Sequence, residues 1–344
     1  MKRLLFSILI LAFFVSCKTN ELWLNVVEPA PVTMPAYIKK VGIIDRTAPT
    51  DASKPLDVVD KVLSLEGKNL DTEGAAETIK GLSEELLNNN RFTEVKSLAD
   101  IDFRTPKVTN FPSPLSWEIV GQICNEAGTD ALFALEKFDT DTRLGYSNSK
   151  KEISTPLGKI PAIEHHADME TLVKTGWRIY DPSGRAILDE FIYDESIMFH
   201  SQGINPVAAA AGLIGRKEAV KEVGNKAGHG YAFRLIPIET RVMRDYFVKG
   251  NNNFKIAKRK ARTGNWDAAG EIWKKETENP KMKVAGRANY NMAIISEING
   301  DVDAALDYAR KAYEDYNIRL GITYVRILEN RRYENDVLDM QEQK

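Results

Sequence analysis

The clearest chemistry in this sequence lies at Cys17. The chain opens with two positive charges at Lys2 and Arg3, an apolar run covers residues 4–15, and Ser16 precedes Cys17. A basic start, an apolar stretch and a small residue at the cut site are typical of a secretory signal peptide. The run is shorter than the ~20 apolar residues of a membrane-spanning helix. We therefore expect cleavage before Cys17. Because cysteine is rare in this chain and falls directly at the cut site, we also expect lipidation at Cys17, and two or more acyl chains would anchor the protein stably.

Two further groups of side chains could do chemistry. His165 and His166 could ligate a metal, but adjacent side chains of an extended chain point to opposite faces. Asp139 and Asp141 share one strand face about 7 Å apart, a pair that could serve acid–base catalysis or lie solvated at a strand end. The sequence contains no Gly-x-Ser-x-Gly, His-Glu-x-x-His or phosphate-loop motif. We therefore expect no enzyme, with no catalytic residue, metal ligand or cofactor.

A repeated word marks the C-terminal part. Residues 264–269 read Gly-Asn-Trp-Asp-Ala-Ala and residues 300–305 read Gly-Asp-Val-Asp-Ala-Ala, 36 residues later. This spacing is close to the ~34-residue tetratricopeptide period, in which paired helices stack and a tight turn joins each pair. The sequence predicts helical pairs at 251–262 with 266–278 and at 285–298 with 302–315, followed by a degenerate capping pair at 318–340.

The first helix of the first pair carries a basic stripe. Its members recur at helical spacing and are Lys255, Lys258, Arg259 and Arg262. Tetratricopeptide arrays bind along a groove lined by the first helix of each pair. The polar side chains expected there are Asn253, Lys260, Asn289 and Ser296. These residue types favour a protein or peptide partner of acidic character. The alternative is that the stripe is only the solvated face of an amphipathic helix.

Composition excludes several classes. The 344 residues are 43% hydrophobic and 28% charged, which is typical of a globular protein, and the net charge of −2 does not suggest nucleic-acid binding. Cys124 is the only other cysteine, so once Cys17 carries lipid no intramolecular disulfide can form.

The middle of the chain alternates between strand and helix patterns. Turn and cap residues separate these elements, including Ser113 as a helix N-cap before Pro114. Gly145, Pro156, Gly158 and Pro161 indicate an irregular insert at 145–167. We expect strands at 21–28, 40–46, 91–95, 130–138, 169–180 and 186–193, and helices at 55–64, 71–89, 114–127 and, in two pieces, 206–235.

Short words within this order resemble a known group. Residues 42–45, 91–95 and 128–135 follow the sequence of elements in the α/β domain of the curli-secretion-channel family and related outer-membrane lipoproteins. The start of the mature chain, Lys-Val-Gly-Ile-Ile-Asp-Arg at 40–46 and the repeats together resemble uncharacterised tetratricopeptide-containing lipoproteins of Bacteroides-type bacteria. The resemblance implies a lipoprotein fold and brings no known activity.

These observations combine into one expectation. The fold class is an N-terminal α/β domain with a mixed sheet and flanking helices, followed by an all-α tetratricopeptide-like helical repeat region. The predicted parts are a signal peptide at 1–16, a lipidated tether at 17–20, the α/β domain at 21–240 and the repeats with capping helices at 241–344.

The expected function is a non-enzymatic, lipid-anchored envelope scaffold that presents its repeats to a partner protein. The resemblance to bacterial lipoproteins implies the outer membrane, because Lys18 and not aspartate follows the lipidated cysteine. The periplasmic face is preferred, and the cell surface is left open. One alternative is a subunit of an oligomeric outer-membrane secretion complex, which requires a long amphipathic insert able to form β-hairpins. The other is a periplasmic hydrolase, which requires a pocket of convergent titratable groups.

Overall fold

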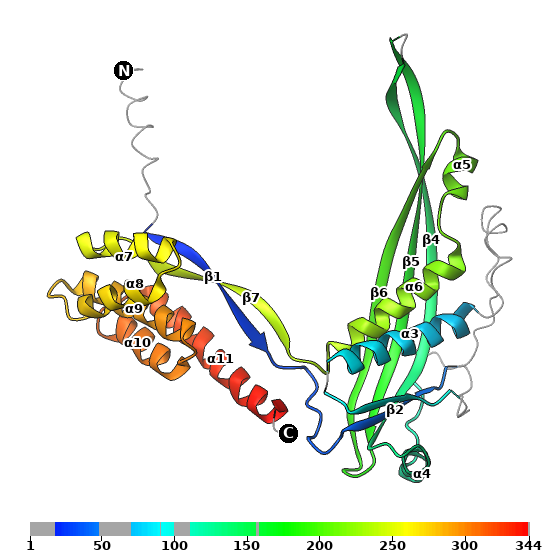
Figure 1. The fold of residues 1–344 in the computed structure, drawn as a ribbon, viewed down its shortest axis with the longest axis horizontal. Helices are drawn as coiled ribbons and strands as arrows, with labels where there is room; N and C mark the ends of the chain where they lie inside the picture. The colour runs from blue at the N-terminus through cyan, green and yellow to red at the C-terminus, as the bar shows by residue number, and fades with distance from the viewer. Residues whose placement is uncertain (1–17, 48–69, 90, 100–110, 156–157, 343–344) are drawn as a thin grey trace. The chain divides into compact units, whose positions relative to one another are not determined.

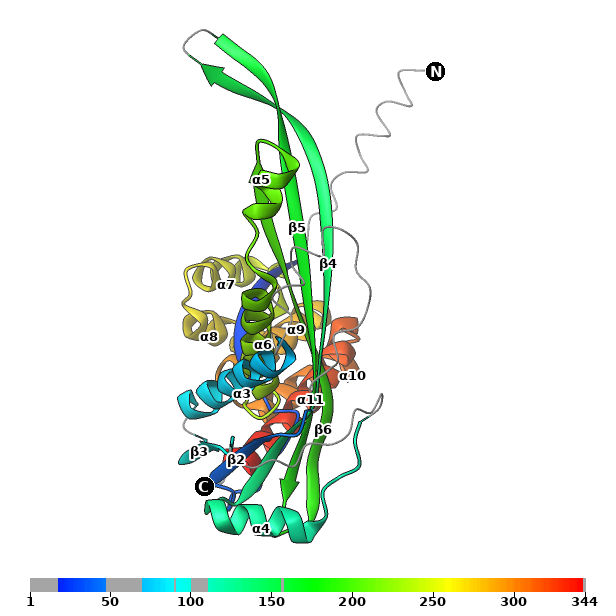
Figure 2. The same cartoon turned by 90° about the vertical axis from the view of Figure 1, so that its right-hand side faces the viewer.

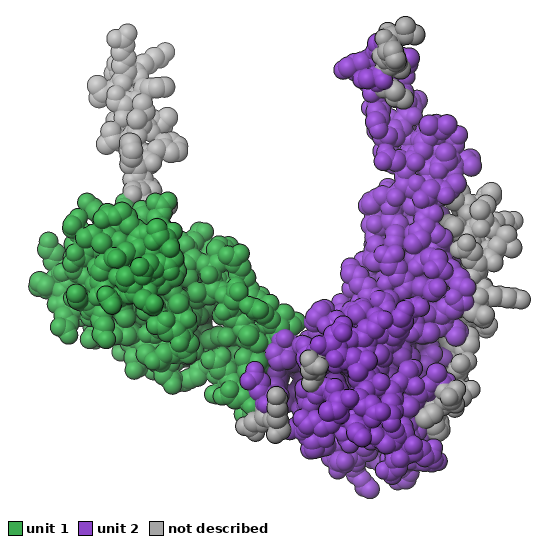
Figure 3. Space-filling view, viewed as in Figure 1, with its two compact units in different colours: residues 1–29, 238–340 green, residues 30–237, 341–344 purple. Residues whose placement is uncertain are grey.

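A computed structural model describes residues 18–47, 70–89, 91–99, 111–155 and 158–342. The chain forms two compact units, one of residues 1–29 with 238–340 and the other of residues 30–237 with the last four residues, coloured separately in Figure 3. The helical unit therefore contains both an early and a late segment of the chain. In the sequence, the α/β unit lies between these two segments.

The α/β unit is built on a mixed sheet in the order β3-β2-β4-β5-β6. Strands β2 (Lys40–Asp45) and β3 (Glu94–Ser97) are parallel, and β2 is also parallel to the start of β4 (Ala131–Thr155). Strands β5 (Gly158–Asp181) and β6 (Ala186–Gly203) continue the sheet in antiparallel order. The short, apolar β2 lies between two neighbours, which explains why its sequence is a continuous apolar run.

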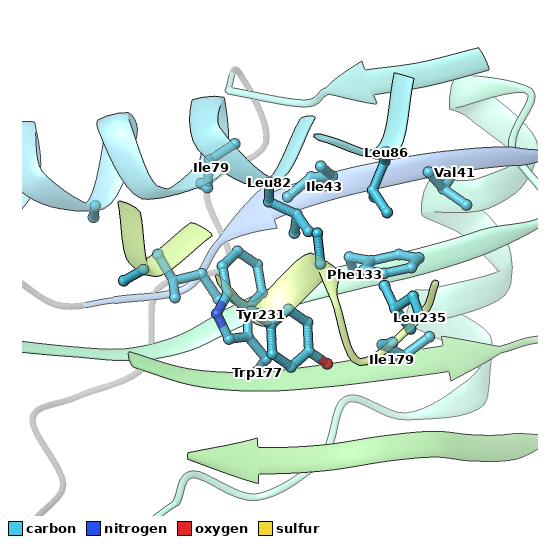
Figure 4. Packing of buried hydrophobic residues seen from close by; sticks show 14 of the residues in the cluster. Val41, Ile43, Ile79, Leu82, Leu86, Phe133, Trp177, Ile179, Tyr231 and Leu235 are labelled. Atoms are coloured by element: carbon cyan, nitrogen blue, oxygen red, sulfur yellow. The ribbon is translucent and has the colours of Figure 1, made fainter. Parts of the chain in front are cut away.

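Helices cover both faces of the part of this sheet that contains β2 and the start of β4. Helices α3 (Leu70–Asn88) and α6 (Arg216–Ala232) lie together on one face (Figures 1 and 2). They approach closely because a Cβ at Gly81 or Gly228 would overlap the backbone of the facing helix. Their apolar side chains bury Phe133, Trp177 and other sheet residues (Figure 4). On the opposite face α4 (Trp117–Ala127) covers a smaller core.

The helix predicted at 114–127 starts later than expected. Its N-cap is Ser116, whose hydroxyl accepts from the amide of Ile119 at 3.4 Å. The prediction that Ser113 is the cap is wrong. The amide of Leu115 donates to the Tyr180 hydroxyl at 3.0 Å, and this bond holds the residues before Ser116 outside the helix. The helix predicted at 55–64 lies outside the described residues.

The largest correction concerns residues 145–167. The predicted irregular insert is instead the distal part of a continuous β4–β5 hairpin, paired from Leu132 with Tyr180 to Thr155 with Gly158. Pro161 is tolerated because β6 pairs with β5 only as far as His165, so the proline lies where β5 has no third strand beside it. Strand β6 also continues ten residues beyond the predicted end at Tyr193.

The helical unit begins with a two-stranded ribbon. Strand β1 (Thr19–Glu28) pairs along its whole length with β7 (Ile238–Phe247), from Thr19 with Phe247 to Glu28 with Ile238. Residues 21–28 therefore belong with the helices and not with the predicted α/β domain at 21–240. Residues 241–247 are strand and not helix, because their cross-strand partner is supplied from the other end of the sequence. Thr19 and Asn20, expected in the tether, are already paired.

The two predicted helical pairs are present in the helical unit. Two antiparallel pairs, α7 (Asn252–Arg262) with α8 (Trp266–Glu276) and α9 (Met282–Ile298) with α10 (Val302–Glu314), follow β7. Gly264 and Gly300 join the pairs at φ of 78° and 79°, the left-handed region that favours glycine. The terminal pair predicted at 318–340 is one helix, α11 (Arg319–Glu342), since its sequence has no glycine or proline after Gly321. The predicted fold class is confirmed.

Candidate protein-binding site

The groove predicted between the repeat helices is closed from within the unit. Every residue of α9 from Val284 to Ser296 is buried. Asn289 is fully buried and its amide donates to the carbonyl oxygens of Ala285 at 2.9 Å and Thr277 at 3.3 Å. Ser296 is also buried. The prediction that Asn289 and Ser296 face a partner is therefore wrong.

The ribbon is one of the elements that cover α9. The Asn291 amide pairs with the backbone of Phe247, accepting from its N–H and donating to its carbonyl, both at 2.7 Å. Phe247 also packs edge-on against Tyr290, with ring centroids 5.2 Å apart. A side chain that satisfies both backbone groups of a strand residue acts as a neighbouring strand would. The polar side chains of α9 thus bind a segment of the same chain.

A buried ion pair fixes the ribbon to the end of α9. Arg244 of β7 donates to both carboxylate oxygens of Glu297, with Nη2–Oε1 at 2.8 Å and Nε–Oε2 at 2.9 Å. The Tyr324 hydroxyl of α11 donates to the same carboxylate. Burial and the neighbouring Glu297 raise the pKa of Tyr324 well above its ordinary value, so this hydroxyl stays protonated and acts as a donor.

The basic stripe of α7 is on the surface. Phe254, Ala257 and Ala261 are buried, while Lys255, Arg259 and Arg262 are exposed and Lys258 is half-buried. Asn253 lies on the other flank of the helix by the 3.6-residue period, and its amide donates to Glu276 Oε1 at 2.5 Å. Asn253 therefore does not join the stripe in one surface as predicted. It ties the start of α7 to the end of α8.

The distal β4–β5 hairpin is exposed and was not predicted from the sequence. We call residues 143–155 and 158–168 the arm. Beyond the last β5–β6 pair, His165 with Gly203, the arm is only two-stranded. Tyr146 and Ile163 lie on the same face of it and are 53% and 58% exposed. Two-stranded hairpins are marginal in water alone, so an arm with exposed apolar side chains indicates a contact surface.

The histidines and aspartates lie on this sheet and have local partners. The hydroxyl of Tyr146 bonds His165 Nδ1 at 2.6 Å on one face, and the hydroxyl of Ser149 bonds His166 Nε2 at 2.9 Å on the other. The two rings diverge, as the geometry of an extended chain predicts. Over the described part of the chain, no cluster of three or more His, Cys, Asp or Glu is arranged to hold a metal ion.

The aspartate pair belongs to a surface charge ladder. Asp139 is directly opposite Lys174 in the sheet, and Asp141 lies 3.5 Å from Arg143. Arg143 in turn lies 3.9 Å from Glu170 on the neighbouring strand. Opposite charges that face each other across strands stabilise pairing by a few tenths to 1 kcal/mol, about as much as other cross-strand pairs. This arrangement supports a structural use of the two carboxylates.

A buried charged group lies deeper in the α/β unit. The carboxylate of Glu136 accepts from Arg46 at 2.5 Å, from Arg178 at 3.0 Å and from the Tyr180 hydroxyl at 2.9 Å. Arg178 also donates to the carbonyl of Pro112 at 3.0 Å. The side chains of Arg46, Glu136 and Arg178 are almost fully buried. Each of these bonds satisfies a group that would otherwise be costly to bury, which indicates a structural network.

Two further findings bear on the predicted anchor and thiol. Cys17 lies outside the described residues, so its lipidation is not observed. Cys124 is buried and unpaired, and burial raises the pKa of its thiol. Among the residues that the structure covers, no helix is both long and apolar enough to cross a membrane.

Comparison with known proteins places the α/β unit and the strand that follows it. A family model described as a domain of unknown function, DUF8603, matches residues 38–247. The chain belongs to this family. A second such model, DUF6340, matches residues 255–335, which cover most of the helices of the other unit. No curated protein matches the chain.

Several solved structures are distantly similar to this chain. Two PelC dodecamers from Paraburkholderia phytofirmans are 10% identical, cover 60% and 61% of this chain and 96% of their own, and have TM-scores of 0.23. A homolog of the neuraminyllactose-binding hemagglutinin from Helicobacter pylori is also 10% identical, covers 68% of this chain and 94% of its own, and has a TM-score of 0.19. Similarity at this level carries no argument about function.

Proposed function

We propose that this protein is a non-enzymatic, lipid-anchored component of the outer membrane that works by binding another protein, as a scaffold in envelope assembly or transport. The anchor is proposed from the signal peptide and Cys17. The absence of catalysis is proposed because the candidate acids and histidines are engaged in local pairs along the sheet. Neither a cofactor nor a nucleic acid has a place in this proposal.

The arm is the observation that carries the proposal. Tyr146 and Ile163 share a face and are each more than half exposed. Ile163 lies beyond the last β5–β6 pair, where the ribbon has no third strand, and Tyr146 lies just before that point, opposite Ala167. A partner that covers this face would bury apolar area and supply packing that the ribbon lacks. The edge of the arm also offers unpaired backbone groups of the kind that extended segments bind by strand addition.

The closed groove changes where the partner is expected. A peptide between α7 and α9 would have to displace Phe247, which is held by the Asn291 amide, and break the buried pair of Arg244 and Glu297. In this proposal the helical repeats therefore form a rigid base that holds the ribbon. The partner contact is assigned to the α/β unit.

The test shortens the arm without altering its register. Residues 147–166 are replaced by Asn-Gly, which closes a two-residue turn on Tyr146 and Ala167, already paired across the strands. We expect proteins recovered with the wild-type chain from cross-linked cells to be lost, while the thermal unfolding of the remaining chain is unchanged. A point variant, Ile163→Lys, keeps the full arm and should weaken recovery. Undiminished recovery with both variants would contradict the proposal.

A second candidate is a subunit of an oligomeric outer-membrane secretion complex. This alternative requires a long insert of paired strands, and the β4–β5 hairpin supplies one where the sequence analysis expected irregular chain. In this case the partner on the arm is a second copy of the same chain. Light scattering of the detergent-extracted protein distinguishes this alternative from the first proposal. An oligomer has a mass that is a multiple of the protomer mass, and shortening the arm should lower that multiple.

A further inference from the structure

The predicted lipid site lies next to a folded edge of the helical unit. The carbonyl of Lys18 accepts from the amide of Val248 at 3.0 Å, and Thr19 begins the paired part of β1. Cys17 is therefore one residue from a fixed position in the fold, and consecutive Cα atoms are about 3.8 Å apart. If Cys17 carries acyl chains, this edge of the unit has to lie at the bilayer surface.

Helix α7 occupies that edge. It begins at Asn252, four residues after Val248, and Figures 1 and 2 both place it beside the start of β1. Its sequence, NNFKIAKRKAR, contains lysines and arginines and no acidic residue. Lys255, Arg259 and Arg262 are exposed on one flank, and no ion pair is found for them among the described residues. At 1.5 Å per residue the helix is only about 16 Å long, so the whole stripe is near the anchor.

We propose that the flank of α7 formed by Lys255, Lys258, Arg259 and Arg262 binds the anionic headgroups of the membrane that holds the protein. The occupant is chosen by charge complementarity and by the position of Lys18, which follows the proposed anchor Cys17 and is hydrogen-bonded to Val248 close to the start of α7. This inference rests on the proposed lipid anchor. Acyl chains alone fix one point, so the protein could swivel about it, whereas a cationic face gives a second contact and fixes the orientation of the helical unit.

The probe is a vesicle of stated composition and the protein is the mature chain with Cys17→Ser, which starts at residue 17 and carries no acyl group. We expect co-sedimentation with phosphatidylcholine vesicles that contain phosphatidylglycerol, weak binding to phosphatidylcholine alone, and loss of binding as salt is raised. The triple variant Lys255→Glu/Arg259→Glu/Arg262→Glu should reduce the partition coefficient more than about tenfold.

A matched variant shows whether a loss of vesicle binding comes from the stripe itself or only from the change in net charge. This control is the triple variant Lys311→Glu/Arg319→Glu/Arg326→Glu, which changes the same number of exposed cations in the same unit. Its three positions lie on α10 and α11 and not on α7. Its binding should fall much less than that of the α7 variant, and both variants should keep the wild-type melting temperature. Equal binding by the wild type and the α7 variant would overturn the inference, as would equal loss in the two triple variants. If the stripe instead holds an acidic peptide, the first of these results is expected.

The assay is independent of the other proposals. It omits the acyl group, so a failure of Cys17 to be lipidated does not change its outcome. It also leaves the arm intact, so a negative result refutes the α7 surface and not the proposed protein partner.

Discussion

At the scale of single residues, Glu297 ties β7 and α11 to the end of α9 inside the helical unit. Its side chain is 4% exposed and accepts three hydrogen bonds from Arg244 and one from Tyr324. Glu297→Gln leaves the Arg244 charge buried without its counter-ion, and we expect a loss of about 3 kcal/mol in the free energy of unfolding. Denaturant unfolding measures this loss. Glu329→Gln removes one member of the exposed pair with Arg310 and should change stability by less than about 0.5 kcal/mol.

The turn glycines give a second prediction at this scale. Gly300 has φ of 79°, so Gly300→Ala forces an L side chain into the left-handed region and should cost about 1 kcal/mol. Gly121 is a helical glycine of α4, and a Cβ there would meet nothing within 4 Å. Gly121→Ala should therefore stabilise the protein, by up to about 1 kcal/mol. Thermal unfolding of the two variants should shift in opposite directions, and a shift in the same direction would contradict the assigned turn.

At the scale of elements, sequence patterns predicted those whose partners lie nearby. The repeated words at 264–269 and 300–305 were sufficient to place both helical pairs, since each turn glycine and its following helix are local features. Strand β7 was missed because its partner, β1, is more than two hundred residues away. Without that partner, residues 241–247 are assigned to the helical region, although Val242, Tyr246 and Phe247 are residue types that favour strands.

The arm and the groove show the same limit on sequence reasoning. Gly145 and Pro161 were read as breakers, but both are paired in the hairpin, because breaker residues are tolerated where a strand has no second neighbour. Asn289 was read as a ligand-facing side chain from its position on the first helix of a pair. Its burial depends on β7 and on the helices around α9, and no local pattern in the sequence contains that information. The stripe on α7 was placed correctly because amphipathic spacing is local.

At the scale of the whole molecule, the order of the chain relates the anchor to the two units. Both connections to the α/β unit pass through the ribbon, at the end of β1 and at the start of β7. The helical unit thus follows the proposed anchor directly in the chain, and the α/β unit is connected to that anchor only through the helical unit. This order supports a role in which one unit holds the membrane and the other holds a partner.

The anchor itself gives a prediction at this scale. Cys17→Ser removes the thiol that would be acylated, so the protein should leave the outer-membrane fraction or accumulate unprocessed. Fractionation of cells followed by immunoblotting measures both outcomes. A variant with Cys124→Ser, at the buried thiol, serves as the control and should fractionate like the wild type. Normal maturation and membrane fractionation of the Cys17→Ser protein would contradict the proposed anchor.

The central claim, that the arm binds a partner protein, is tested most directly by photo-cross-linking in intact cells. A photoreactive phenylalanine derivative replaces Tyr146 on the arm, or Tyr333 on α11 as the control, two tyrosines that are 53% and 67% exposed. The account predicts a discrete cross-linked adduct from position 146 and none of that mass from position 333. The same adducts from both positions, or no adduct from position 146 in chains that fold and fractionate normally, would contradict it.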